Sequence, residues 1–588
     1  LAVGATRGLV AALKVRGLRA EAVGRRHRSD FSGGPSLNYR AGWARRACVF
    51  IATAFALATA APASAEIVAD SGFRPQPDGF SFRNYGGGHA ELNALEMQRI
   101  YGRGVCLTGK GAACVLRPGA RTAMRAANRS MSGGHCYGFA VLSETVYKGL
   151  LPRFGFSSLA QLGAPNADST TFEIPLEGNI KIQRAIARAW YFQQLPSVAR
   201  TAVRGKPSKI IDKLREVLQP GEREGWTLGI IDFRYGGHQI TPFALDDLGG
   251  GKYEILVYDN NWPDEERRVQ VDTVAETWEY ELAPGMVWEG DATTKTMHLH
   301  RVRPALGLQP CPFCVGRAGL RSKYNEITLD APGVEHAHLI LRDRKGRRTG
   351  YVDGKLVNEI PGVKVEPRAT GVLRAAEEDD PALVSAEPVY RVPRGKQVRI
   401  TVDARHLERR ELQMLTVVGP AFDAHTRKLV LNPGERAVLA LDPKRERLRY
   451  TPAPATREAA VMFNGEVRDR KHPKNVRAAF EIEIAALGLP KGARVEFRKR
   501  LKYGVLQFGH AAKRRARVRY RVQVKELTAK RGEPRVATRV RWYSLAGRKR
   551  AAFVSLSALA RKIGKPEVVV ISDRGKRLAG KSPRKASR

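Results

Sequence analysis

The pattern of hydrophobic and polar positions changes about halfway along the chain. In the first half, apolar residues recur three or four positions apart in 90–127, 139–147 and 180–218, which predicts helices. Strand-like apolar runs follow at 227–233, 238–245 and 253–258, and the Gly-rich turn between the last two predicts a hairpin. Because helices come first and a sheet follows, we expect one α+β domain over 66–305.

After residue 314 the pattern consists of short alternating runs separated by Gly, Pro and Asp. This spacing is typical of β-sandwiches. We expect an all-β C-terminal half with a β-sandwich (Ig-like) module over 331–455 and a second, basic and β-rich module over 456–588. Residues 306–330 are then a linker, and a short helix is expected at 555–563.

The N-terminal segment has the pattern of a secretory signal peptide. A basic stretch at 40–46 runs into an apolar run at 47–60, and the small residues of 61–65 resemble a cleavage site. We therefore interpret 1–65 as an upstream extension and a signal peptide that is cleaved after about Ala65. The protein is expected to be secreted, periplasmic or at the cell surface, with no integral membrane segment once the signal is removed.

Export changes how the six cysteines are interpreted. Cys48 lies within the signal peptide, and local cysteine pairs form disulfides in an oxidising compartment. The expected pairs are Cys106 with Cys114, across a Gly/Lys turn, and Cys311 with Cys314. Cys136 then has no nearby partner, which marks it as a candidate reactive thiol.

The composition is strongly basic. The 588 residues include 101 Lys and Arg against 58 Asp and Glu, a formal net charge of +43. Such a charge favours polyanionic partners, for example an anionic cell-surface polymer. The basic residues are densest after Lys491, where they also fit the solvated faces of strands. We find no nucleic-acid-binding motif, so nucleic acid is not an expected partner.

Candidate chemistry centres on Cys136, within the segment 133–140 (GGHCYGFA). Downstream come His238, after two glycines, and Asp259 with Asn260 at the end of a predicted strand. A thiol, an imidazole and a carboxylate or amide, in this order, suit a cysteine nucleophile with its base and an orienting group. The thiol is expected at a helix N-terminus, which favours the thiolate.

Three of these motifs resemble those of papain-like cysteine peptidases. Residues 136–140 (CYGFA) resemble the family's Cys-Trp-Ala-Phe-Ser helix start, and 237–238 resemble the beginning of its His strand. Residues 260–262 (NNW) resemble Asn-Ser-Trp, and 257–259 (VYD) are similar to the His…Asp ending of the bacterial, bacteriocin-processing branch. The resemblance covers the N-terminal half only.

The resemblance implies a papain-like fold with Cys136 as nucleophile and His238 as general base and then acid. The third member is Asp259, which ends the strand directly, or Asn260, which aligns better with Asn-Ser-Trp. Both remain open.

One position departs from the family pattern. The family places a Gln six residues before the Cys to stabilise the oxyanion, and this chain has Ser130 there. Ser130, Asn128 and the Cys136 backbone N–H are the candidate replacements. The loss of one such donor costs about 10²–10³ in rate in other enzymes.

The function expected from these features is that of an exported cysteine hydrolase. It would cleave peptide or isopeptide bonds in a peptide or protein substrate without a cofactor or metal, and its β modules would bind a surface. One alternative is a transglutaminase-type acyl transferase, which uses the same Cys-His-Asp order. Another is a non-catalytic surface or adhesion protein on a papain-like scaffold.

A zinc site is a further alternative that the sequence disfavours. His298 and His300 alternate on one predicted strand ahead of Cys311 and Cys314. Two imidazoles and two thiolates are suitable zinc ligands. In an exported chain, however, a local disulfide between the two cysteines is favoured.

Overall fold

The computed structural model describes most of the chain after residue 65. The described residues are 66–232, 236–312, 314, 323–330, 336–369, 372–373, 383–384, 387–419, 423–445, 447–468, 476–500, 505–530, 533–555, 570–571 and 577–579. The predicted signal peptide, with Cys48, and the predicted helix beyond Ser555 lie outside them. No helix in the described part of the chain is long and apolar enough to cross a membrane.

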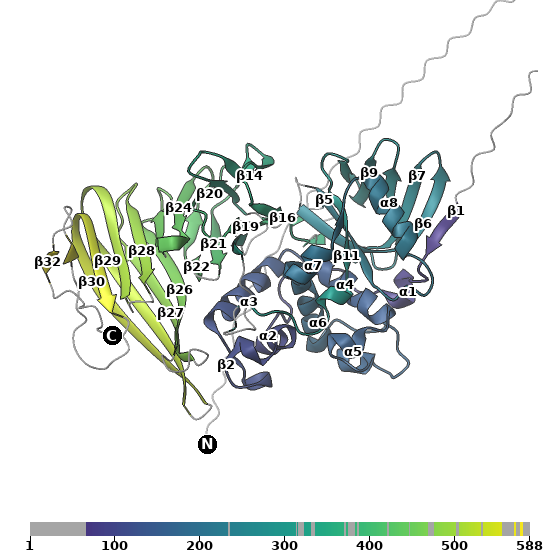
Figure 1. Cartoon of the computed structure of the whole chain (residues 1–588), viewed down its shortest axis with the longest axis horizontal. Coiled ribbons are helices and arrows are strands. Elements are labelled where there is room, and N and C mark those ends of the chain that lie inside the picture. The colour runs from purple at the N-terminus through teal and green to yellow at the C-terminus, as the bar shows by residue number, and fades with distance from the viewer. Residues whose placement is uncertain are drawn as a thin grey trace, which may run out of the picture. The chain divides into compact units, whose positions relative to one another are not determined.

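The N-terminal region is α+β, and its helices precede most of its strands. The helices are α1 (Pro75–Asp78), α2 (Ala94–Tyr101), α3 (Pro118–Met131), α4 (Cys136–Tyr147), α5 (Leu151–Phe154), α6 (Ile180–Tyr191), α7 (Pro196–Thr201) and α8 (Pro207–Val217). Helices α2 and α3 correspond to the helical pattern of 90–127, and the loop from Cys106 to Cys114 separates them. In Figure 1 the helices α2–α6 gather together, whereas α8 lies among the strands.

Nine of the described strands form one antiparallel sheet in the order β10-β9-β8-β7-β6-β5-β11-β4, with β1 paired to β6. They are β1 (Glu66–Asp70), β4 (Val203–Arg204), β5 (Trp226–Asp232), β6 (Gly236–Gly249), β7 (Lys252–Tyr258), β8 (Glu266–Asp272), β9 (Thr277–Ala283), β10 (Met286–Asp291) and β11 (Met297–Arg301). The predicted hairpin is confirmed, because β6 pairs with β7 over Thr241↔Tyr258 to Gly249↔Lys252.

Local sequence explains where the main helices begin. Asn93 and Asn179 precede α2 and α6, and their side chains accept the backbone N–H of Glu96 and Ile182. Such side-chain caps satisfy N–H groups that the first turn of a helix leaves unpaired. Helices α3, α7 and α8 instead begin with proline, whose missing N–H costs nothing at the first helical position.

Helix α4 is the central helix of the region. Every residue from Cys136 to Thr145 is buried. It packs against α6 on one side and β6 on the other. At Gly138 a Cβ atom would lie 2.3 Å from the Ile186 carbonyl oxygen, so only glycine allows α4 and α6 to approach this closely.

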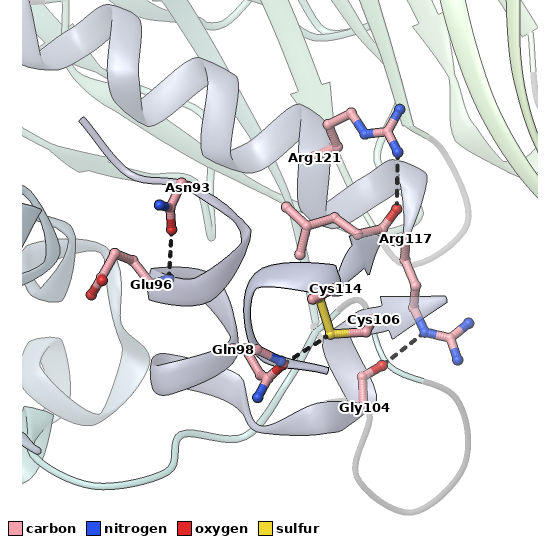
Figure 2. The surroundings of a disulfide bond; sticks show 10 residues. Asn93, Glu96, Gln98, Gly104, Cys106, Cys114, Arg117 and Arg121 are labelled. Carbon is pink, nitrogen blue, oxygen red and sulfur yellow. Dashed lines mark hydrogen bonds between the residues drawn. A yellow bond between two sulfur atoms is a disulfide. The ribbon is translucent and has the colours of Figure 1, made fainter. Parts of the chain in front are cut away.

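Both predicted disulfides are confirmed: Cys106 is bonded to Cys114, and Cys311 to Cys314. The first joins β2 (Cys106–Thr108) to the residue directly before β3 (Val115–Leu116) and closes a small loop beside α2 (Figure 2). Gln98 of α2 accepts the backbone N–H of Gly111 in that loop at 2.8 Å. Arg117 donates to the Gly104 carbonyl at 2.8 Å, so both ends of the loop are held.

The prediction of separate β-sandwich (Ig-like) modules is wrong. Nineteen of the described strands, β12–β16 and β19–β32, belong to one antiparallel sheet. Within it, 15 strands form a large, nearly closed barrel. Up to β25 the strands of the sheet are β12 (Tyr324–Asp330), β13 (His338–Arg342), β14 (Arg348–Val352), β15 (Lys355–Asn358), β16 (Lys364–Glu366), β19 (Val389–Pro393), β20 (Val398–Asp403), β21 (Glu411–Val418), β22 (Asp423–Thr426), β23 (Leu429–Leu431), β24 (Arg436–Asp442) and β25 (Arg447–Thr451).

The remaining strands of this sheet are β26 (Glu458–Arg468), β27 (Val476–Leu487), β28 (Arg494–Arg500), β29 (Val505–Lys530), β30 (Glu533–Ser555), β31 (Val570–Ile571) and β32 (Arg577–Ala579). A separate two-stranded sheet consists of β17 (Val372–Leu373) and β18 (Leu383–Val384).

Long-range strand pairing explains why the two expected modules are one. Strand β22 pairs with β26, and β25 pairs with β28, so hydrogen bonds cross the expected limit at residue 455. Strand β29 pairs with β28 near its start and with β27 further along. One apolar core runs from Ile327 to Ala552. The alternation of apolar residues indicated which faces are buried, but not which strands are neighbours.

The dense basic segment lies in β29, where charged and buried residues alternate. Arg517 and Arg519 are exposed, whereas Val518 and Tyr520 are buried. These arginines therefore occupy the outward face of a strand, as expected for solvated strand residues. Binding of an anionic polymer by this face remains a prediction from charge.

A shared core predicts a shared unfolding transition. Ile400 and Ile482 lie on opposite sides of the module boundary expected at residue 455, and both are fully buried in the same core. We expect Ile400→Ala and Ile482→Ala each to lower the free energy of unfolding by about 2–5 kcal/mol. In differential scanning calorimetry, both should shift the same transition. The control Val536→Ala, at a site that is 61% exposed, should leave it nearly unchanged; two separately shifted transitions would contradict a single core.

Candidate active site

Cys136 is the first residue of α4 and is fully buried. In the described part of the chain it is the one cysteine outside a disulfide. The backbone N–H groups of Gly138 and Phe139 bond to the His135 carbonyl at 2.7 and 3.2 Å, which closes the first turn of the helix. The sulfur thus lies at the positive end of the helix dipole.

His238 and Asp259 meet at the end of the β6–β7 hairpin. His238 lies near the start of β6, and Asp259 directly follows β7. The Nε2 atom of His238 is 2.8 Å from Oδ1 of Asp259, and both side chains are fully buried. Among the described residues, Nδ1 of His238 makes no hydrogen bond of normal geometry. It is therefore the nitrogen available to exchange a proton with a neighbouring thiol.

The charge on His238 depends on its neighbours. Burial alone lowers the pKa of His238, but the Asp259 carboxylate and the Cys136 thiol raise it by more, to about 10. Burial likewise raises the pKa of Asp259, and its bonds to His238, Tyr280 and Asn261 bring it below the ordinary value. At neutral pH the pair is therefore an imidazolium and a carboxylate, with the thiol close enough to act on the ring.

Further hydrogen bonds saturate the buried carboxylate. Tyr280, on β9, donates its hydroxyl to Oδ2 of Asp259 at 2.5 Å. The backbone N–H of Asn261 donates to Oδ1 at 2.8 Å. A buried carboxylate is tolerated when its oxygen atoms are bonded in this way. The position of the carboxylate, and with it the orientation of the imidazole, is thus set from two sides.

Asn260 has a different place from Asp259. Its side-chain amide donates to the Gln239 carbonyl at 2.9 Å and to the Cys136 carbonyl at 3.3 Å. The His238 ring donates its hydrogen bond to Asp259, whereas Asn260 links the hairpin to the first residue of α4. Both residues that the sequence left open thus lie at the site, in different positions.

Asn84 connects the two loops that carry the site. Its Oδ1 accepts the backbone N–H of His135 at 2.8 Å, and its own N–H donates to the Asn260 carbonyl at 2.7 Å. Its side-chain amide also donates to Oδ1 of Asn261 at 3.2 Å. One side chain therefore fixes the segment before Cys136 relative to the segment after β7.

The side chains proposed for the oxyanion have other partners. Ser130, on α3, donates its hydroxyl to Oδ1 of Asp330 at 2.7 Å and contacts the guanidinium of Arg368. The Asn128 amide donates to the Leu92 carbonyl at 3.0 Å. Of the three candidates, the backbone N–H of Cys136 remains, at the start of a helix where N–H groups have no partner within the helix.

A segment of the C-terminal half covers the site. Ala369 forms a parallel bridge with Gly237, the neighbour of His238. Its carbonyl accepts the Trp190 indole N–H at 3.0 Å, and its N–H donates to Gln193 at 2.9 Å. Residues 366–369 also line a cavity of about 30 Å³ beside His238. A cavity of this size holds little more than water, so a substrate requires the segment to move.

His298 and His300 do not meet a pair of free thiols. Both lie on β11 and are buried, with ring centroids 4.7 Å apart. Burial lowers the pKa of His298 far below its usual value and that of His300 to about 3, so both rings are neutral at physiological pH. Cys311 and Cys314 form a disulfide, so they offer no thiolate for a zinc site.

Sequence reasoning missed three contributors to the site, Asn84, Tyr280 and the covering segment 366–369. The alternation of Trp278, Tyr280 and Leu282 in β9 indicates that Tyr280 faces inward, but not which group it meets. Asn84 lies in a glycine-rich loop without a distinctive pattern. Residues 366–369 lie more than 100 positions after Asp259, so only the fold brings them to the site.

Comparisons with protein-family models, curated proteins and solved structures find no match to this chain. The resemblance to papain-like peptidases therefore rests on the sequence motifs alone.

The raised pKa of His238 predicts how stability depends on pH. A histidine whose pKa is raised by folding stabilises the protein below its unfolded pKa, near 6.5, and this stabilisation is lost as pH rises through about 10. In Asp259→Asn the carboxylate that raises this pKa is absent, so the loss should be smaller. Urea unfolding from pH 6.5 to 10 measures it.

Tyr280→Phe is the matched control, because it removes a hydrogen bond and keeps the carboxylate. It should lower the free energy of unfolding by about 1–3 kcal/mol and retain the wild-type loss towards pH 10. Equal pH dependence in Asp259→Asn and the wild type would show that the pair does not titrate as described.

Proposed function

We propose that the N-terminal region is a cysteine hydrolase that cleaves peptide or isopeptide bonds through an acyl-enzyme on Cys136. The observation that carries this proposal is the convergence of three fully buried groups: a thiol at a helix N-terminus, an imidazole, and a carboxylate that holds that imidazole. Nucleophile, base and orienting group in this arrangement suit acyl transfer.

In the first half-reaction, the Cys136 thiolate attacks the carbonyl carbon and forms a carbon–sulfur bond. The imidazolium of His238 then gives its proton to the nitrogen of the leaving amine, and the carbon–nitrogen bond breaks. Asp259 keeps Nε2 of the ring bonded, so that Nδ1 is the nitrogen that transfers the proton. The product is a thioester on Cys136 and a free amine.

In the second half-reaction, His238 accepts a proton from water as the water oxygen attacks the thioester. The carbon–sulfur bond breaks and the carboxylic acid leaves, which restores the Cys136 thiolate beside the imidazolium of His238. The backbone N–H of Cys136 is the donor proposed for the oxyanion in both steps. Ser130 has no such role in this scheme, because Asp330 and Arg368 engage its hydroxyl.

The covering segment supports a peptide as the substrate. Ala369 is held by its backbone, through the bridge to Gly237 and hydrogen bonds to Trp190 and Gln193. At Gly237 a Cβ atom would lie 2.8 Å from the Arg368 carbonyl oxygen, so glycine permits this close approach. Backbone-directed contacts bind an extended chain of many sequences, as a peptidase cleft requires.

The two disulfides support the proposal of export to an oxidising compartment. Both Cys106–Cys114 and Cys311–Cys314 are local pairs, and such bonds are uncommon in proteins of the cytosol. A secreted, periplasmic or cell-surface location thus remains proposed for the protein.

The proposal predicts a reactive thiol and peptide release that depend on the same residues. Iodoacetamide should label Cys136 at neutral pH faster than it labels free cysteine, because His238 favours the thiolate. His238→Ala should abolish this advantage. Cys136→Ala and His238→Ala should each reduce peptide release by at least about 10³-fold. Mass spectrometry of the labelled protein and of a peptide library measures both effects.

His89→Ala is a control that should retain labelling and peptide release. The His89 ring packs against Tyr85, with centroids 4.2 Å apart, and no contact with Cys136 or His238 is found among the described residues. Incorporation of an added amine without release of an acid would instead favour a transglutaminase-type transferase. A thiol no more reactive than free cysteine, even after the covering segment is loosened, would favour a non-catalytic scaffold and overturn the proposal.

The covering segment predicts that labelling is limited by its movement. Gln193 bonds both the N–H and the carbonyl of Ala369, at 2.9 and 3.2 Å. Because two hydrogen bonds together stabilise a contact by about 1–3 kcal/mol, Gln193→Ala should accelerate labelling of Cys136 by roughly tenfold. The rate of iodoacetamide incorporation in the native protein is the measurement.

The matched control is Gln219→Ala, at an exposed glutamine whose side chain bonds the Arg215 carbonyl. It should label at the wild-type rate. If Gln193→Ala also labels at that rate, residues 366–369 are not the barrier to Cys136.

A further inference from the structure

A second group of functional side chains lies in the C-terminal sheet, apart from Cys136. His338 is the first residue of β13, His336 lies two residues before that strand, and Glu387 lies two residues before β19. Nε2 of His336, Nδ1 of His338 and a carboxylate oxygen of Glu387 all lie within 4.8 Å of one another. Strand β13 pairs with β14 and β20, so the cluster joins segments that are not neighbours in the sheet.

The two imidazoles converge on a single oxygen atom. Oε2 of Glu387 is 3.0 Å from Nδ1 of His338 and 3.4 Å from Nε2 of His336. Alternate residues of an extended chain point to the same side, which explains why both rings face Glu387. Ligands around a tetrahedral zinc ion, with bonds of about 2.0–2.2 Å, lie roughly 3.4 Å apart. The spacing of these atoms therefore suits ligands of one ion.

Neighbouring groups orient two of the three side chains, Glu387 and His338. The other oxygen of Glu387 accepts the Leu339 N–H at 2.8 Å and the Tyr390 hydroxyl at 2.6 Å, which leaves Oε2 directed at the histidines. The His338 ring is stacked against Tyr351 and His406, with centroids 4.1 and 4.0 Å apart. Outer groups that fix ligand orientation are characteristic of metal sites in proteins.

An ion pair is the simpler alternative, in which the histidines only neutralise Glu387. A single ring is enough to pair with the one charge of Glu387, whereas both imidazoles are directed at the same oxygen atom. A divalent cation can be bonded by all three side chains. Glu387 is fully buried, whereas His338 is 26% exposed, so the cluster also has an approach from solvent.

We propose that His336, His338 and Glu387 bind a divalent transition-metal ion, with zinc the best fit to two imidazoles and one carboxylate. Three protein ligands leave a fourth position for water or another small ligand. The ion would link β13 to the segment before β19. This site is independent of the proposed hydrolase, since it shares no residue with Cys136, His238 or Asp259.

The test is a titration of the full-length protein with Zn²⁺ and Co²⁺. We expect one tightly bound equivalent, measured by calorimetry, and the visible absorption of tetrahedral Co²⁺. Loss of one ligand in Glu387→Gln or His336→Gln should weaken binding by at least about 100-fold. The metal should also raise the melting temperature of the wild type and not that of these variants.

His89→Ala is the matched control and should bind like the wild type. Cys136→Ser in the same titration distinguishes metal bound at the free thiol from metal bound at the proposed site. The proposed site should still bind one equivalent of metal in this variant. A variant has folded if its melting temperature equals that of the metal-free wild type. The test requires only one of Glu387→Gln and His336→Gln to meet this condition. Unchanged affinity in Glu387→Gln, or no bound equivalent in Cys136→Ser, overturns the proposal.

Discussion

The burial of the Asp259 carboxylate is the constraint on which the candidate active site depends. A charge without access to water must be paired and hydrogen-bonded, and Asp259 meets this need through His238, Tyr280 and the Asn261 backbone. These partners belong to β6, β9 and the loop after β7, so the requirement holds separate parts of the sheet in one arrangement. The imidazole acquires its orientation and its raised pKa from the same contacts.

A second buried charge holds the segment that covers the site. Arg368 forms an ion pair with Asp330 at 3.0 Å, and Ser130 bonds to both. Arg368 precedes Ala369, which pairs with Gly237 beside His238. Ser130, at the expected oxyanion position, therefore helps to hold the covering segment in place. Access to the thiol and stability of this anchor are consequently linked, because a buried ion pair is costly to break.

The C-terminal half shows how strand pairing decides architecture. Alternating residues such as Val518 and Tyr520 identify the buried face of a strand, and this much followed from the pattern. The pattern did not show that the strands on both sides of residue 455, the expected module boundary, pair with one another. Strand β22 pairs with β26, and β25 with β28, across this position. Backbone hydrogen bonds carry no side-chain signature, so a row of similar strands is compatible with two small sandwiches or with one large sheet.

The sequence by itself determined the local elements and the two disulfides. It also identified the Cys136 thiol, His238 and Asp259 as candidate site residues. These follow from periodicity, cysteine spacing and motif order, which are properties of short segments. Only the tertiary structure decided that Asp259 rather than Asn260 bonds the imidazole, that Asn84 and Tyr280 support the site, and that 366–369 cover it. Each of these depends on contacts between residues far apart in the chain, and long-range packing is selected by the whole core rather than by local pattern.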